Sequence, residues 1–208
     1  MAIFADRTAA GVDLAAGLAA WRGADAVIAG IPRGGIVVAA EVARVLGLPL
    51  AAIVVRKLGA PGQQEFAVGA IADDVRVLTE QGGRIGAATP AQLDAVEAVE
   101  REELRRRSVI FGSIEGVAGR TVIVVDDGIA TGATATAACR SLRGRDVAHI
   151  VLAVPVAPAA WTPDPVAVDE YVCPHRQERF WAVGEFYDDF AQTSDAEVVA
   201  LLHHDPRA

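Results

Sequence analysis

The sequence is poor in the residues that mark disulfide-rich, metal-bound or membrane-spanning domains. Its 208 residues include two cysteines, Cys139 and Cys173, which lie far apart and outside any CxxC or histidine-rich context. Structural thiols are therefore expected, rather than a disulfide framework or a cysteine metal site. Charges or glycine interrupt every apolar run before the roughly 18 residues that a membrane helix needs. Met1 to Ala10 lacks the apolar core of a signal peptide, so we expect a cytoplasmic protein with no membrane partner.

Positive charge is also scarce, since 27 acidic residues outnumber 19 basic ones and the net charge is −8. This balance argues against a nucleic-acid partner, and the lack of a GxGxxG motif argues against dinucleotide binding. An anionic ligand would need a local positive pocket. A chain of this length can bury about two-thirds of its unfolded surface in one core. Prolines after residue 154 mark a change of character, so we expect one structural unit with a core, 1–155, and a C-terminal hood packed on it, 156–208.

The most informative segment is an apolar strand that ends in two carboxylates. Val122 to Val125 is β-branched on both faces, which is typical of a strand buried in a parallel sheet. Asp126 and Asp127 follow at the carboxyl end, where ligands of such sheets gather, and can accept hydrogen bonds from vicinal ribose hydroxyls. Thr131 to Thr134 then begins a helix whose N–H groups and dipole favour a phosphate, while Gly128 is expected to allow a sharp turn. A helix cap or a receiver-type phosphoacceptor would also suit the acid pair, but neither requires the Thr-Gly-Ala-Thr that follows.

Two further strand ends supply basic residues. The predicted strand Ala26 to Ile31 leads into Pro-Arg-Gly-Gly and a helix from Ile36 to Leu46, an arrangement that can bind an anion. Gly34 and Gly35 are expected to permit unusual backbone angles and close main-chain approach, and Arg33 offers a forked cation. The predicted strand Leu50 to Val55 is followed by Arg56 and Lys57, the only lysine beside 18 arginines. A lone lysine favours a functional point charge, although a solvated basic pair is the alternative.

The segment 122–134 resembles the phosphoribosyl-diphosphate signature of type I phosphoribosyltransferases, in which an apolar strand leads into two acids and a Thr-Gly loop. The resemblance implies an α/β fold with a mainly parallel twisted sheet, flanking helices and a small C-terminal hood. It implies that Asp126 and Asp127 hold the ribose 2′ and 3′ hydroxyls and that Ala130 to Thr134 cradle the 5′-phosphate. The Pro-Arg-Gly-Gly turn would bind pyrophosphate, and a mobile loop, here Gly59, Pro61 and Gly62 to Phe66, would close over the reacting centre.

The implied activity is transfer of a 5-phosphoribosyl group from phosphoribosyl diphosphate to a nitrogenous acceptor, typically a nucleobase, with release of pyrophosphate. Mg²⁺ would be carried by the substrate near the acid pair, with no direct protein ligand, and relatives are often homodimers. The expected catalytic residues are Arg33, Lys57, Asp126 and Asp127. The expected substrate-binding residues are Gly34, Gly35, Arg56, Gly128, Ile129, Ala130, Thr131, Gly132, Ala133 and Thr134.

Two alternatives stay open. Enzymes of this family that use 6-oxopurines carry an acid where this chain has Ala130, so hypoxanthine and guanine are disfavoured. This departure, with an undefined hood, leaves room for a non-catalytic regulator that binds phosphoribosyl diphosphate or a nucleotide. A hydrolase or phosphotransferase with Asp126 as nucleophile is the other alternative. The aromatic-rich segment Arg179 to Phe190 could stack a planar acceptor or form a satellite core.

The rest of the sequence predicts helices and strands that support the site. The expected elements are a helix from Arg7 to Trp21 capped by Asp6, a hairpin of Val68 to Ile71 with Val75 to Leu78, a charged helix from Thr89 to Ser108, strands Val147 to Val154 and Val166 to Val172, and a last helix from Asp195 to His203.

Overall fold

The computed structural model describes residues 2–61, 63–79 and 89–203, and for residues 63–67 it describes only the backbone. A five-stranded sheet in the order β2-β1-β6-β7-β9 forms the centre of this part of the chain, and all its neighbouring strands are parallel. The prediction of a mainly parallel sheet flanked by helices is thus confirmed. The strands are β1 (Ala26–Gly30), β2 (Leu50–Ala52), β6 (Thr121–Val125), β7 (His149–Ala153) and β9 (Glu170–Val172).

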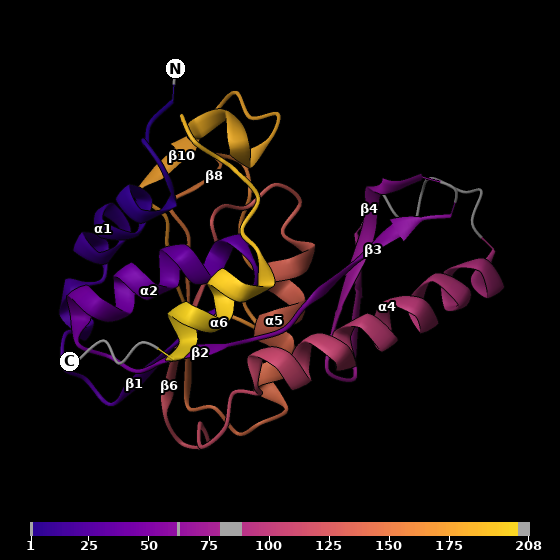
Figure 1. Cartoon of the computed structure of the whole chain (residues 1–208), viewed down its shortest axis with the longest axis horizontal. Helices are drawn as coiled ribbons and strands as arrows, with labels where there is room; N and C mark the ends of the chain where they lie inside the picture. Colours follow the sequence, from indigo (N-terminus) through magenta and orange to yellow (C-terminus); the bar gives the residue numbers. More distant parts are fainter. Residues whose placement is uncertain (1, 62, 80–88, 204–208) are drawn as a thin grey trace.

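Helices cover both faces of this sheet, as Figure 1 shows. The helices α1 (Arg7–Gly17) and α2 (Gly34–Leu46) pack on one face, and α5 (Ala133–Arg143) packs on the other. Successive residues of β6 alternate between the two cores, with Val122 and Val124 beneath α5 and Ile123 beneath α1 and α2. Strands buried on both faces explain the continuous apolar runs of the sequence.

The first helix begins as predicted but ends early. Asp6 caps it, since its carboxylate accepts a hydrogen bond from the Ala9 N–H at 2.8 Å. The helix stops at Gly17, and a separate 3₁₀ turn, η1 (Ala19–Trp21), completes the predicted segment.

A second sheet projects beside the body together with the long helix α4 (Pro90–Phe111), at the right of Figure 1. It consists of the antiparallel strands β3 (Arg56–Ala60), β4 (Gln63–Ala72) and β5 (Val75–Leu78). The hairpin across Asp73 and Asp74 is confirmed, although β4 is longer than predicted. The start of α4 also follows the prediction, with a complete capping box between Thr89 and Gln92.

The sequence prediction is wrong for the segment after β2. That strand ends at Ala52 instead of Val55, and the residues expected to begin a loop form β3, which pairs with β4 in the register Arg56 to Ile71. Leu58 is buried in the core that β3 shares with α4, and this tertiary contact outweighs the turn-like composition. The predicted loop residue Gly62 and the side chains from Gln63 to Phe66 lie outside the described residues.

The C-terminal part places short elements above the sheet and one helix beside it. The strands β8 (Val156–Pro158) and β10 (His175–Gln177) pair in parallel, and η2 (Val183–Phe186) follows them. The last helix, α6 (Asp195–His203), matches its prediction and packs against α2 and α4. The strand predicted from Val166 is shorter than expected, since β9 begins at Glu170. Within the described residues, no helix has both the length and the apolarity to span a membrane.

Candidate functional site

The site lies where the carboxyl ends of β1 and β6 meet. The two strands are direct neighbours, and the Ile31 N–H donates to the Val125 carbonyl oxygen at 2.9 Å, which brings the following loops together. A cavity of about 460 Å³ opens over these loops. Its wall contains most of the predicted site residues, namely Arg33, Gly34, Lys57, Asp126, Asp127, Gly128, Ile129, Ala130, Thr131, Gly132 and Thr134. This is the end of a parallel sheet at which ligands are expected.

The acid pair forms the floor of the cavity. The Asp127 N–H donates to Asp126 Oδ1 at 2.9 Å, so the first carboxylate is fixed by the backbone of the second. Burial raises the pKa of Asp126 well above its usual range, and the adjacent charge of Asp127 raises it further. Burial also raises the pKa of Asp127, against the opposing charge of Arg7. The pair is therefore short of positive charge and of hydrogen-bond donors, which ligand hydroxyls or a cation would supply.

Arg7 belongs to the site, and the sequence analysis missed it. Its Nε donates to Asp127 Oδ2 at 2.8 Å, and the side chains of the two residues are only 11% and 16% exposed. The residue lies at the start of α1, so its helical context predicted nothing about a partner 120 positions away. The single available signal was a basic residue in the first turn, where a carboxylate is more usual.

Gly34 and Gly35 are required for close packing with the acid pair. A Cβ on Gly34 would lie 2.1 Å from Asp127 Oδ2 and 2.6 Å from Arg7 Nε. A Cβ on Gly35 would lie 2.9 Å from the Asp126 Cα. Neither glycine has a positive φ angle, so the expectation of unusual backbone angles is wrong, and the need for glycine is steric. Their N–H groups begin α2, which keeps them available at a helix N-terminus.

The loop after the acids ends in a helix start that suits an anion. Gly132 precedes α5 with a φ of 79° and provides no side-chain cap, so no side chain of that residue competes for the first N–H groups of the helix. Its missing Cβ also makes room for Trp161, whose ring nitrogen would lie 2.3 Å from such an atom. Gly128 has no positive φ and packs instead against Val183. Ala133, the first residue of α5, is buried and does not line the cavity.

The three predicted cations differ in their surroundings. Lys57 lines the cavity, and its positive charge lowers the pKa of both acids. Arg33 also lines it and lies 3.8 Å from Asp195 at the start of α6. Arg56 does not line it: its guanidinium bonds Glu100 of α4 at 2.7 Å, beside a neighbouring cavity of about 720 Å³ that Lys57 also lines. The structure therefore brings Arg33 and Lys57 to the acid pair and leaves Arg56 outside.

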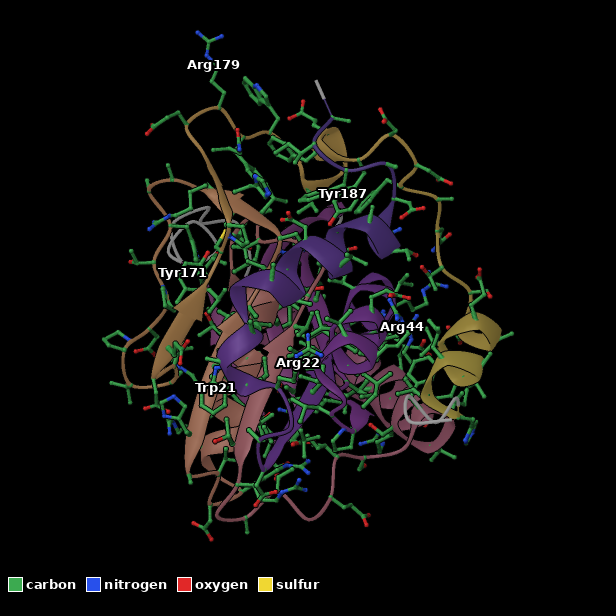
Figure 2. The ribbon with its side chains drawn as sticks, turned by 90° about the vertical axis from the view of Figure 1, so that its left-hand side faces the viewer. Trp21, Arg22, Arg44, Tyr171, Arg179 and Tyr187 are labelled. Carbon is green, nitrogen blue, oxygen red and sulfur yellow. The ribbon has the colours of Figure 1, made fainter. Side chains whose placement is uncertain are left out.

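The aromatic segment from Arg179 to Phe190 contains residues of both expected kinds, some in a satellite core and some on the wall of the cavity. Phe186 and Tyr187 are buried with Phe4 in a satellite core, and the Tyr187 hydroxyl donates to the Asp127 carbonyl oxygen at 2.6 Å. Trp181 lines the cavity although the residue is 88% exposed, and Phe190 lines it too. Figure 2 shows Tyr187 turned toward the body of the molecule beside α1, while Arg179 points away from it.

A magnesium ion that arrives with a polyphosphate fits this donor set. Among the described residues, no group of three or more His, Cys, Asp or Glu side chains is arranged to hold a metal ion. Mg²⁺ usually keeps several waters and binds through one or two carboxylates together with substrate phosphates. Asp126 and Asp127, which line one cavity, offer such a pair.

Comparisons with known proteins agree with this geometry. Residues 6–191 match the model of the phosphoribosyl transferase domain. A protein provisionally named a phosphoribosyl transferase in two strains of Mycobacterium tuberculosis is 47% identical over 211 residues, which cover 97% of this chain. The match covers 47% of that protein, so the chain spans about half the length of the curated relatives it matches.

Two solved structures have a similar fold. The crystal structure of TT1426 from Thermus thermophilus has a TM-score of 0.72 and 39% identity, and the match covers 97% of this chain and 98% of that one. A hypothetical protein from Neisseria gonorrhoeae, solved with bound ppGpp, has a TM-score of 0.52 at 17% identity, and the match covers 94% of this chain and 90% of that one. The second likeness concerns the fold alone.

Proposed function

The chain belongs to the phosphoribosyl transferase domain family, and from this premise we propose that it transfers the 5-phosphoribosyl group of phosphoribosyl diphosphate to a nitrogenous acceptor, releasing pyrophosphate. One observation carries the proposal: the acid pair, the uncapped start of α5 and the side chains of Arg33 and Lys57 surround one cavity. Phosphoribosyl diphosphate needs hydrogen-bond acceptors for its ribose hydroxyls, an anion site for its 5′-phosphate and cations for its pyrophosphate.

The proposed roles follow from position. Asp126 and Asp127 accept hydrogen bonds from the ribose hydroxyls and orient the ring, while their negative charge favours positive charge on the sugar. The first N–H groups of α5, with Thr131 and Thr134, bind the 5′-phosphate. Both threonines line the same cavity as the two acids and follow the carboxyl end of β6 in the chain.

Arg33 and Lys57 neutralise the pyrophosphate as it leaves, and the N–H groups at the start of α2 add donors. Mg²⁺, when bound with the substrate, supplies further neutralisation of the phosphate oxygens. Arg56 is assigned no direct contact, because its pair with Glu100 directs it to the neighbouring cavity.

For the acceptor we propose a planar nitrogenous ring, such as a nucleobase. Trp181, Val183 and Phe190 give the hood side of the cavity an apolar wall that suits a ring face. Ala130 also lines the cavity, so the acid expected in enzymes that use 6-oxopurines is replaced by a methyl group. We therefore expect hypoxanthine and guanine to be poor acceptors.

Calorimetry tests the proposal directly. Phosphoribosyl diphosphate is titrated into the protein with and without Mg²⁺, and released pyrophosphate is then assayed with purine, pyrimidine and pyridine acceptors. Magnesium-dependent binding followed by release with an acceptor supports the transferase. Binding without release from any acceptor would favour the regulator, and no binding would remove the phosphoribosyl assignment.

A paired variant locates the binding site. Asp126→Asn with Asp127→Asn should abolish binding, since both predicted ribose acceptors lose their charge. The matched control replaces Asp25 and Asp94 by Asn, because their side chains are 80% and 67% exposed and lie outside the cavity. Binding that survives the first pair would show that the site is elsewhere.

A further inference from the structure

The guanidinium of Arg7 is fixed by three contacts with two distant parts of the chain, the acid loop and the segment at residues 190–191. Its Nε donates to Asp127 Oδ2 at 2.8 Å, and its Nη1 donates to the Ala191 carbonyl oxygen at 2.8 Å. Its Cζ lies 3.8 Å from the centre of the Phe190 ring. Two nitrogens of the planar guanidinium donate hydrogen bonds in different directions, and its face stacks on a ring. These contacts together fix the group in one orientation.

The backbone of Asp127 is held as well. Its carbonyl oxygen accepts the Tyr187 hydroxyl at 2.6 Å, and its N–H donates to Asp126. Arg7 holds Oδ2, and within the described residues no other residue donates a hydrogen bond to Oδ1. The carboxylate therefore has one oxygen held by the protein and one that can accept a bond from a ligand in the cavity.

Gly34 packs directly against the pair formed by Arg7 and Asp127. The Arg7 and Asp127 side chains both occupy the space that a Cβ of Gly34 would fill, with Arg7 Nη2 at 3.0 Å from it. The pair thus lies directly on the turn that we assign to pyrophosphate, and a shift of Arg7 would alter the acid and the turn together.

We propose that Arg7 is a positioning residue: it orients Asp127 so that Oδ1 meets the ribose, and it links that orientation to the hood segment 187–191. This inference rests on the proposed function, because it assigns to Arg7 a role in binding the same substrate. The affinity for phosphoribosyl diphosphate then depends on a contact between the first helix and the hood, as well as on the acid loop itself.

The expected effect is sizeable, because Arg7 bonds a charged and largely buried acceptor. Such bonds contribute more than neutral ones, and Arg7→Met should weaken magnesium phosphoribosyl diphosphate binding by about tenfold or more. Arg7→Lys should be intermediate, since an ammonium cannot bond along two fixed edges of a fork. The KM for phosphoribosyl diphosphate should rise, and the KM for the acceptor should not change.

A double-mutant cycle separates positioning from simple bracing of the fold. Calorimetry with magnesium phosphoribosyl diphosphate is carried out on the wild type, Arg7→Met, Asp127→Asn and the double variant. If Arg7 acts through Asp127, its removal costs about tenfold in the wild-type background and about threefold or less in the Asp127→Asn background. Equal losses in both backgrounds would show that Arg7 only braces α1, and would overturn the inference.

The control is Arg44→Met on α2, where the side chain is 56% exposed and pairs with Glu41 in the preceding turn. Figure 2 labels this residue. Wild-type affinity in a folded Arg7→Lys protein would also contradict the inference, and this variant serves if Arg7→Met does not fold. Failure of the wild type itself to bind phosphoribosyl diphosphate would instead refute the proposed function.

Discussion

Replacing Gly34 by alanine tests whether the site depends on close packing between the turn and the acid pair. The new Cβ would lie 2.1 Å from Asp127 Oδ2 and 2.6 Å from Arg7 Nε, so both side chains must move. Overpacking of this kind costs about 1–3 kcal/mol. We expect a loss of stability of this size, or roughly 2–12 °C in Tm for a chain of this length.

The loss of binding should be larger than the loss of stability. Displacing the carboxylate of Asp127 removes a charged acceptor from the ribose, so affinity should fall about tenfold or more. Gly35→Ala should behave differently, because its Cβ would meet the backbone of Asp126 at 2.9 Å and of Val125 at 3.0 Å. Backbone cannot move aside as a side chain can, and we expect a greater loss of stability than for Gly34→Ala.

Calorimetric titration and thermal unfolding of the variants give both quantities. Gly144→Ala is the matched control, because its φ is −70° and the nearest atom to a new Cβ, the Ser141 carbonyl oxygen, lies at an ordinary 3.5 Å. Binding and Tm of the control should equal those of the wild type. A Gly34→Ala protein that binds phosphoribosyl diphosphate with wild-type affinity would refute the packing argument.

Three other outcomes follow from the same geometry. The pKa of Asp126 is raised in the folded state, so the folded state loses stability as the pH rises from the ordinary pKa of an aspartate to the raised one. Asp126→Asn should therefore raise the Tm at pH 7. In a series of melts at different pH, this gain in Tm should become smaller toward pH 5. Gly132→Ala combines a φ of 79° with a clash against Trp161, so it should abolish phosphate-dependent binding in a calorimetric titration. Trp181→Ala should raise the acceptor KM in the pyrophosphate assay while changing the unfolding free energy by less than about 0.5 kcal/mol, since the residue is 88% exposed.

The acid loop was predictable because its signals are local. A β-branched run, two carboxylates and a helix start follow each other within thirteen residues, and the parallel sheet fixes where they point. The same logic located the Pro-Arg-Gly-Gly turn. What it could not supply was the steric reason for Gly34, which depends on side chains from two other elements.

The errors arose where tertiary contacts decide the outcome. Residues 56–60 contain glycine and alanine, which predicted a loop, yet pairing with β4 and burial of Leu58 make them a strand. Arg7 escaped notice because its partners, Asp127 and Ala191, are 120 and 184 positions away. Single-sequence patterns describe neighbours along the chain, and such contacts leave no period or motif to detect.

The contact of Arg7 with Ala191 also sets an order of events during protein synthesis. The two residues are 184 positions apart, so the first helix must wait for almost the whole described chain before its arginine can be locked. At usual elongation rates of about 5–20 residues per second, this interval lasts roughly ten to forty seconds. The strands β1, β2, β6 and β7 and both acids emerge well before that moment. A nascent chain can therefore possess most of its sheet, with both acids in place, while Arg7 still lacks its contact at Ala191. The orientation of Asp127 that we propose for ribose binding is then complete only after residue 191 has emerged.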